Sequence, residues 1–173
     1  VGAAPSEGLT VPSAAELVVF LWQHGADAQP TTATADRGSY FDLSPIDRGD
    51  LARRDVSLAL EEMGIRVEAT HHEVAPGQHE IDLAFTDALA LADAIATARF
   101  VVKTVAARHG LHATFMPKPH AHQDGSGLHF TQYLARDAAN LFTSTNAPDR
   151  GTLHQPDLSE AGPAHLRALP RPA

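Results

Sequence analysis

Three imidazoles and two carboxylates lie within ten residues of this chain, at His71-His72-Glu73-Val74-Ala75-Pro76-Gly77-Gln78-His79-Glu80. Carboxylate and imidazole groups are the usual protein ligands of hard and borderline divalent cations. Pro-Gly is a turn dipeptide, so the two halves of the segment are predicted to fold back on each other as a β-hairpin. That hairpin would bring Glu73 and Glu80 onto neighbouring strands, close enough to share one metal ion. A polar surface hairpin is the alternative for such a segment taken alone.

Alternation along the two strands determines which of these side chains can act together, because successive side chains of a strand point to opposite faces. If Glu73 and Glu80 face the same way, His71 shares their face and His72 points away. We therefore expect His71 beside the two carboxylates. For His72 and His79 we expect packing, or hydrogen bonding that supports the ligands, rather than metal contact.

A second group of polar residues lies in the segment 117–129, where two prolines and two glycines predict a loop. His120 and His122 form a His-x-His pair, and in an extended segment both imidazoles would project to one side, as in many metal chelates. A solvent-exposed pair is the alternative. Gly125 allows the backbone to approach a ligand closely, and His129 stands at the start of the strand that follows the loop.

Composition limits the classes of function. The chain has 173 residues, which suits one domain over 1–173. A formal net charge of −8 argues against a nucleic-acid partner and against binding to an anionic membrane. We see no apolar segment that would span a bilayer and no leader peptide. The absence of cysteine excludes disulfides, thiolate metal sites and cysteine nucleophiles, and fits the cytoplasmic location that we expect.

Apolar patterning predicts the elements that must position these residues. The expected elements are a strand at 16–22, a loop at 26–37, a helix at 47–63, hairpin strands at 65–74 and 78–85, a helix capped by Thr86 and ended by Gly110, and strands at 111–116 and 128–134. The expected buried stripes are Leu51, Val56, Ala59, Leu60 and Met63 on the first helix, and Leu89, Ala92, Ile95, Val102, Val105 and Ala106 on the second. This order of elements predicts an α+β fold with a largely antiparallel sheet.

Four segments of the chain closely resemble the catalytic domain of class I glutamine synthetases, in the family's order and at about its spacing. They are Tyr40–Asp47, His71–Glu80, His109–Pro119 and Asp124–His129. The resemblance defines a catalytic core at 16–142 and leaves 143–173 as a degenerate proline-rich C-terminal segment. It implies a curved antiparallel sheet, a half-barrel, with helices packed on one side and divalent metals lining it.

The resemblance also implies an activity and a set of ligands. In that family ATP phosphorylates the γ-carboxylate of glutamate, ammonia displaces the phosphate, and the metals neutralise the transferring group. Glu73 and Glu80 match two ligands of one metal. Glu16 and His129 match ligands of the other metal.

Four residues are the candidates for binding the substrate. Gly125 matches a backbone position that lines the glutamate pocket of the family. With it we count Asp124, which stands where the family has asparagine, together with His71 and Tyr40. The implied partner is therefore a small molecule.

The chain departs from the family pattern near these residues. Val18 replaces the second glutamate of a Glu-x-Glu strand, which removes a ligand of the first metal. Thr131 and Tyr133 stand at two polar positions that serve nucleotide binding. His120 and His122 replace an apolar residue and a glycine. We also expect a truncated homologue, without the family's N-terminal β-grasp domain and without the C-terminal arginines of the catalytic domain.

Three functions follow from this pattern. The first is an ATP-dependent carboxylate–amine ligase with Mg²⁺ or Mn²⁺. The second is a repurposed transition-metal enzyme of small-molecule biosynthesis, in which His120 and His122 join His129 to bind Zn, Fe, Mn or Cu and nucleotide binding is lost. The third is a non-catalytic binding or regulatory remnant. Since truncation would bare sheet edges and apolar surface, we expect a homo-oligomer, most simply a dimer.

Overall fold

The computed structural model describes residues 8–27, 29–137 and 139–142. By their contacts the chain divides into two units, of which the larger spans Pro12–Gln132. In the smaller unit the short strands β7 (Ala135–Arg136) and β8 (Ala139–Asn140) pair with each other, and Thr10 forms a bridge to Ala135. The C-terminal segment 143–173 lies outside the described residues.

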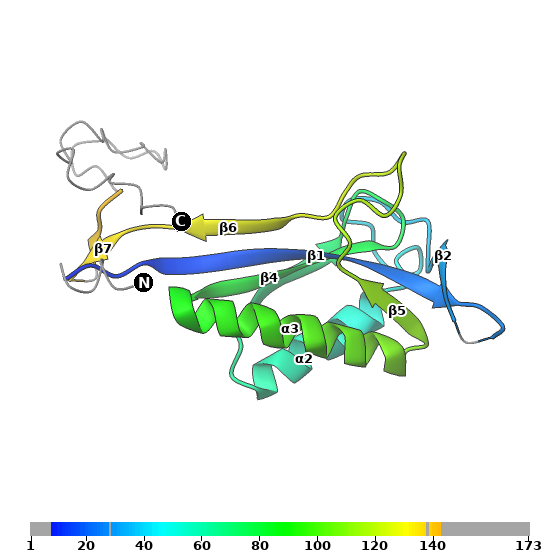
Figure 1. Ribbon diagram of the computed structural model, residues 1–173, viewed down its shortest axis with the longest axis horizontal. Helices are drawn as coiled ribbons and strands as arrows, with labels where there is room; N and C mark the ends of the chain where they lie inside the picture. The colour runs from blue at the N-terminus through cyan, green and yellow to red at the C-terminus, as the bar shows by residue number, and fades with distance from the viewer. Residues whose placement is uncertain (1–7, 28, 138, 143–173) are drawn as a thin grey trace, which may run out of the picture. The chain divides into compact units, whose positions relative to one another are not determined.

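The larger unit contains one six-stranded sheet, in which every strand pairing is antiparallel (Figure 1). Its strands are β1 (Pro12–His24), β2 (Pro30–Thr34), β3 (Val67–His72), β4 (Gln78–Asp87), β5 (Leu111–Thr114) and β6 (Leu128–Gln132). The strand order is β2-β1-β4-β3, and β5 and β6 also pair with β1. The long β-branched and aromatic strand β1 therefore organises the whole sheet.

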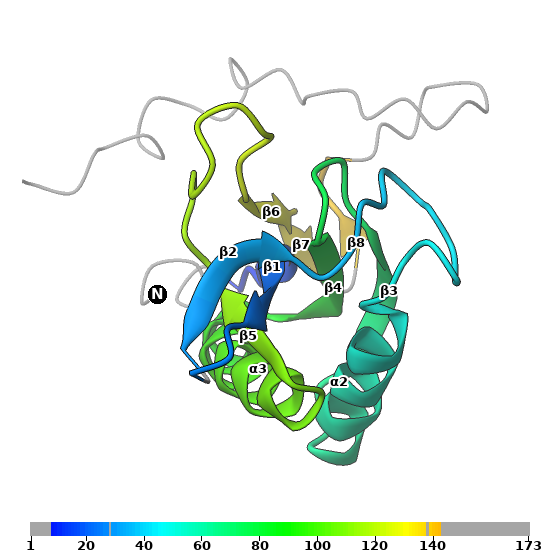
Figure 2. The same cartoon turned by 90° about the vertical axis from the view of Figure 1, so that its right-hand side faces the viewer.

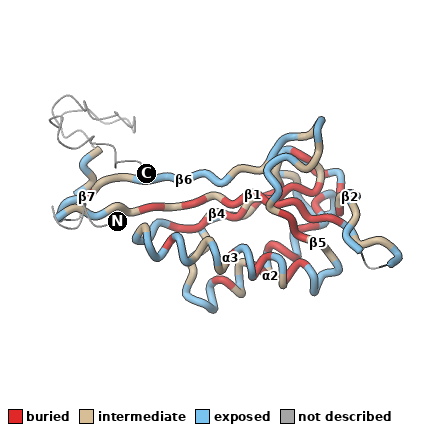
Figure 3. Tube along the Cα trace, viewed as in Figure 1, coloured by how far each residue is buried: buried red, intermediate tan, exposed pale blue. Residues whose placement is uncertain are grey.

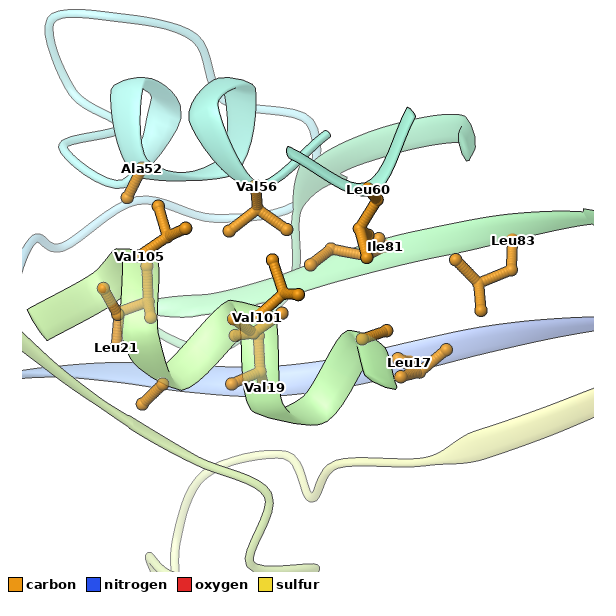
Figure 4. Close-up of a cluster of buried hydrophobic side chains, with 14 of the residues drawn as sticks. Leu17, Val19, Leu21, Ala52, Val56, Leu60, Ile81, Leu83, Val101 and Val105 are labelled. Carbon is orange, nitrogen blue, oxygen red and sulfur yellow. The ribbon is translucent and has the colours of Figure 1, made fainter. Parts of the chain in front are cut away.

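Two helices, α2 (Asp50–Glu62) and α3 (Ala88–Arg108), pack on one face of this sheet (Figure 2). The buried core between sheet and helices includes Leu17, Val19, Leu21, Val56, Leu60, Ile81, Leu83, Val101 and Val105 (Figure 4). Burial follows β1, β4 and the helix sides that face them (Figure 3). The core residues Leu17, Val19 and Leu21 of β1 face the helices, so the alternating Glu16 and Val18 point to the opposite face. None of the described helices combines the length and apolar content needed to cross a membrane.

The structure confirms the α+β class, the curved antiparallel sheet with helices on one side, and the hairpin around Pro76 and Gly77. The loop expected at 26–37 is wrong in part, because Pro30–Thr34 forms β2. β2 pairs with the far end of β1, where Trp22 lies opposite Thr34. This pairing exists because β1 continues to His24, beyond the predicted end of the strand.

The helices differ from the prediction in the residue that caps α3 and in some of the residues expected to be buried. Thr86 does not cap α3. Instead, the Asp87 carboxylate accepts hydrogen bonds from the backbone N–H groups of Leu89 and Ala90. Leu51, Met63 and Leu89 were expected in the buried stripes but are more than half exposed, at 56%, 59% and 58%. These three residues lie at helix ends, where the sheet no longer covers the helix. Ala92 was also expected in a buried stripe and is exposed.

Candidate metal centre

Glu16 of β1 lies in the middle of a row of ligand-type residues that crosses three strands. It is directly opposite Asp82 of β4 on one side and directly opposite His129 of β6 on the other. The Glu16 Oε2 atom lies 3.1 Å from Nδ1 of His129. Side chains of directly opposed residues stand close together on one face. The strand register therefore gathers two carboxylates and an imidazole from distant parts of the sequence.

The end of the loop before β6 leaves room for the His129 ring. A Cβ atom at Gly127 would lie 2.9 Å from ring atoms of His129, closer than non-bonded atoms tolerate. The Gly127 carbonyl accepts a hydrogen bond of 3.2 Å from the N–H of Val18, which ties this part of the loop to β1. Glycine at this position thus allows the imidazole to stand beside Glu16.

Glu80 joins this row to the hairpin. It lies opposite Val18 of β1 and opposite His71 of β3, and its Oε1 atom lies 3.2 Å from Nε2 of His71. Two groups of three residues place one ligand atom each within 4.8 Å of one another: Glu16, Glu80 and His129, and His71, Glu80 and Asp82. Both groups therefore include the Glu80 carboxylate.

Hydrogen bonding indicates which nitrogen of His71 is free to bind a cation. Nδ1 lies 3.0 Å from the carbonyl oxygen of His72, so Nδ1 carries the proton. Nε2 faces Oε1 of Glu80 and is the nitrogen left for a cation in the neutral ring. A lone pair and a carboxylate oxygen at this separation repel each other unless a cation or a proton lies with them. Glu73 Oε1 lies 3.8 Å from Nδ1 of the same ring, on the side where alternation places it.

The electrostatics of this face also favour a cation. Burial raises the pKa of Glu80, and the nearby carboxylates of Asp82 and Glu73 raise it further. Burial is the largest cause of the raised pKa of Asp82, to which Glu16 contributes despite the opposing effect of His71. None of the ion pairs among the described residues brings a lysine or arginine to these carboxylates. A divalent ion would neutralise them with the oxygen and nitrogen ligands that such ions prefer.

The predicted His-x-His pair does not join either group within the described part of the chain. The His120 ring packs edge-on against Phe20 and Trp22, with centroid separations of 5.5 and 5.6 Å. The His122 side chain is exposed. The structure thus places His120 on an aromatic surface of β1 and does not bring the pair to Glu80.

The four predicted substrate-binding residues fall in two places. The Tyr40 ring lies edge-on to the His71 ring at 5.4 Å. In the loop, the Gly125 carbonyl accepts a hydrogen bond of 3.0 Å from Nε2 of Gln78, which links the loop to β4. Asp124 beside it is exposed.

Asp82 is a candidate that the sequence-based ligand set lacks. It follows Glu80 by two residues on one strand, so alternation alone places both carboxylates on the same face. Its position opposite Glu16 depends on how β4 pairs with β1, and the sequence gives no direct sign of that register.

A third group of ligand-type residues, Asp36, Asp47, His72 and His79, is fully buried. Here Arg53 of α2 supplies the positive charge: its Nη1 atom lies 2.6 Å from Asp47 Oδ2 and 2.8 Å from Nδ1 of His79. With a guanidinium already between these ligands, the group is better explained as a buried hydrogen-bond network than as a metal site.

His72 completes that network as an imidazolium. Its Nδ1 lies 2.6 Å from the carbonyl oxygen of Glu73, and its Nε2 lies 2.9 Å from Asp36 Oδ1, so both nitrogens face acceptors. Burial lowers the pKa of His72, but the hydrogen bonds to Asp36 and Glu73 outweigh it and raise the pKa overall. The geometry agrees with the packing and hydrogen-bonding role expected for His72 and His79.

A groove of about 370 Å³ adjoins the carboxylate row. Glu16 and Asp82 stand at its wall, and Phe85 and Thr131 line it farther along the sheet. An aromatic ring, a hydroxyl group and two carboxylates that could hold a metal thus border one open space.

Residues 3–155 match the protein family whose description is "Glutamine synthetase, catalytic domain". The chain belongs to this family. It is 55% identical over 128 residues to the glutamine synthetase of Thermus thermophilus, covering 74% of this chain and 29% of that protein. It is 50% identical over 139 residues to the glutamine synthetase of Clostridium saccharobutylicum, covering 80% of this chain and 31% of that protein. The chain thus spans about a third of the length of these relatives.

Solved structures give the same result for the fold. The cryo-EM structure of Plasmodium falciparum glutamine synthetase matches with a TM-score of 0.71 and 26% identity, over 84% of this chain and 34% of that one. The ligand-free structure of GmaS matches with a TM-score of 0.71 and 33% identity, over 82% of this chain and 34% of that one. The glutamine-synthetase-like fold inferred from four sequence segments is therefore confirmed.

Proposed function

We propose that this chain forms the divalent-metal part of a glutamine-synthetase-type active site and takes part in ATP-dependent ligation of a carboxylate to an amine. The observation that carries the proposal is the meeting of two ligand groups at Glu80, on the face of the sheet opposite the helices. Glu16 and His129 would hold one ion, and Glu80 and His71 the other. Glu73, which was expected beside Glu80 as a ligand, is in neither group of three and lies 3.8 Å from Nδ1 of His71. Since each group of three contains two carboxylates and one imidazole, Mg²⁺ or Mn²⁺ fits better than softer metals.

The groove beside the metal ligands supports a nucleotide as co-substrate. Phe85 offers an aromatic ring for a base, Thr131 offers a hydroxyl group, and Glu16 stands where the groove meets the metal ligands. An ion held there would neutralise phosphate oxygens, which is what phosphoryl transfer requires of a metal. The amine and carboxylate substrates would be small molecules held near His71 and Tyr40.

Two other functions are less well supported. A transition-metal enzyme built around His120 and His122 would need those imidazoles beside His129, whereas His120 packs on Phe20 and Trp22. A non-catalytic binding role is favoured by Val18, which leaves the β1 side of Glu80 without a carboxylate.

The direct test is release of phosphate from ATP in the presence of Mg²⁺, glutamate and ammonia. We expect release that needs all four components and that falls roughly 100-fold or more in Glu80→Gln, because a metal ligand is lost. Glu62→Gln, which removes an exposed charge on α2, is the matched control and should keep the wild-type rate. Release that continues without glutamate, or that Glu80→Gln leaves intact, would contradict the ligase. Absence of release, alone and with a candidate partner subunit, would favour the non-catalytic role.

A further inference from the structure

The metal site of this chain lacks an oxygen ligand on one side. Glu80 faces the central strand at Val18, a residue that is 5% exposed and offers only methyl groups. A divalent ion bound by Glu80 would therefore meet a hydrocarbon surface in the direction of β1. Mg²⁺ and Mn²⁺ need near-complete shells of oxygen and nitrogen ligands. Any further protein oxygen for this ion would have to come from a different direction.

Asp82 has the position and the free atom for this role. It projects from the same face of β4 as Glu80, and one of its oxygens lies within 4.8 Å of ligand atoms of both Glu80 and His71. Its Oδ1 atom is buried and has no hydrogen-bond partner, although the side chain as a whole is close enough to Glu80 to share a hydrogen bond with it. Leaving a buried carboxylate oxygen without a donor is unfavourable, because its hydration is lost and nothing replaces it. A cation between these three side chains would satisfy it.

The residues directly opposite Asp82 on the two neighbouring strands carry no positive charge. On β3 it lies opposite Ala69, and on β1 it lies opposite Glu16, another carboxylate. Asp82 also lines the groove at its junction with the metal ligands. An ion held by Asp82 would thus lie between the hairpin and the open groove.

We propose that Asp82 is a ligand of the ion bound by Glu80 and His71, and that it supplies the carboxylate oxygen that Val18 cannot. This inference rests on the metal site of the proposed function. It adds Asp82 as a ligand, and this ligand reaches the ion from the groove side instead of from β1. His71 contributes Nε2, Glu80 contributes a shared carboxylate, and Asp82 closes the group from the groove side.

Mn²⁺ binding to the purified chain tests this role without relying on catalysis. We expect Asp82→Asn to bind Mn²⁺ roughly 10–100-fold more weakly than the wild type in calorimetric titrations, the loss typical when a metal site is disturbed. Glu68→Gln is the matched control, because it removes an exposed charge from β3 near the same groove. It should bind Mn²⁺ within about twofold of the wild type, since exposed charges are largely screened.

A second variant separates ligation from folding. In the Asp82→Asn background, Val18→Glu would place a carboxylate opposite Glu80 and should recover most of the lost affinity. Without metal, Asp82→Asn should melt no lower than the wild type, because the change removes one of several neighbouring negative charges. A merely structural Asp82 would instead lower the melting temperature without metal, and Val18→Glu would not restore binding.

The outcomes distinguish this inference from the proposed function. Wild-type Mn²⁺ affinity in Asp82→Asn, or an equal loss in Glu68→Gln, would overturn the role of Asp82 and leave the metal site itself standing. A wild-type chain that binds no Mn²⁺ would overturn both.

Discussion

At the scale of single residues, Asp36 holds three segments together next to the hairpin. Its Oδ1 atom accepts hydrogen bonds from His72 and from the backbone N–H groups of Gly38 and Gly77, and its Oδ2 atom accepts one from the N–H of Arg48. The carboxylate thereby fixes the turn of the hairpin that carries the proposed ligands. Such a buried charge with four hydrogen bonds is costly to replace.

We expect Asp36→Asn to lower the free energy of unfolding by roughly 3–5 kcal/mol, because the buried imidazolium of His72 loses its partner. An amide also turns one acceptor into a donor that faces a backbone N–H. Urea denaturation measures the change. Asp42→Asn is the control, since Asp42 accepts one hydrogen bond from the N–H of Ser39 at a more exposed site. Equal losses in both variants would contradict the special role of Asp36.

Asp36 should also make the stability of the protein depend on pH. Burial tends to raise the pKa of Asp36, but the hydrogen bonds from His72, Arg48, Gly77 and Gly38 outweigh it and hold the pKa well below its ordinary value of 3.8. A lowered folded-state pKa gives stability that is fully present above that ordinary value and is lost as the pH falls toward the folded value. The stability difference between wild type and Asp36→Asn should therefore be full at about pH 5, where the His72 imidazolium is also protonated, and shrink below about pH 4. Urea titrations at several pH values measure it, and a difference that grows in acid would contradict the assignment.

At the scale of elements, the start of α3 depends on one side chain. Asp87 ends β4 and caps α3, so the same residue fixes where the strand stops and the helix begins. Thr86, the residue before it, carries a side chain that could also cap a helix. The structure selects Asp87 because its carboxylate reaches two free N–H groups of the first turn.

We expect Asp87→Ala to destabilise the protein by about 1 kcal/mol, the usual cost of losing a helix cap. Thr86→Ala should cost clearly less, because Thr86 does not bond to the helix N-terminus in the described structure. Thermal or urea unfolding of the two variants measures the difference. A larger effect at Thr86 would support the cap that the sequence pattern favours and contradict the structure.

At the scale of the whole molecule, β6 leaves an edge that another chain could use. Within the described residues β6 pairs only with β1, and its side chains Leu128 and Phe130 are 44% and 54% exposed. Unpaired strand edges with apolar side chains favour association. The expectation of a homo-oligomer, most simply a dimer, thus becomes a proposal about this edge.

Light scattering at micromolar concentration tests it. We expect a dimer in the wild type and a shift toward monomer in Phe130→Lys, because a charge at the edge opposes pairing. Phe100→Lys is the control: Phe100 is 70% exposed on α3, away from the strand edge. A monomeric wild type, or an equal shift in Phe100→Lys, would contradict an interface at β6.

Much of the fold and part of the site follow from the sequence by itself. The periodicity of apolar residues determines two helices and the main strands, and Pro76-Gly77 determines the hairpin. Strand alternation then fixes that His71 and Glu73 lie beside Glu80 while His72 points away. These features are local, so a stretch of chain encodes them without reference to distant residues.

Which distant residues meet depends on the way the strands pair in the folded protein. The register of β1 against β4 and β6 sets Asp82, Glu16 and His129 in one row, and no local pattern encodes a pairing between such separated segments. The loop path that turns His120 onto Phe20 is decided in the same way. The sequence alone therefore predicts the hairpin that carries the proposed ligands, and the family of the chain. Long-range strand pairing, which depends on burial of the whole core, places the other proposed ligands around Glu80.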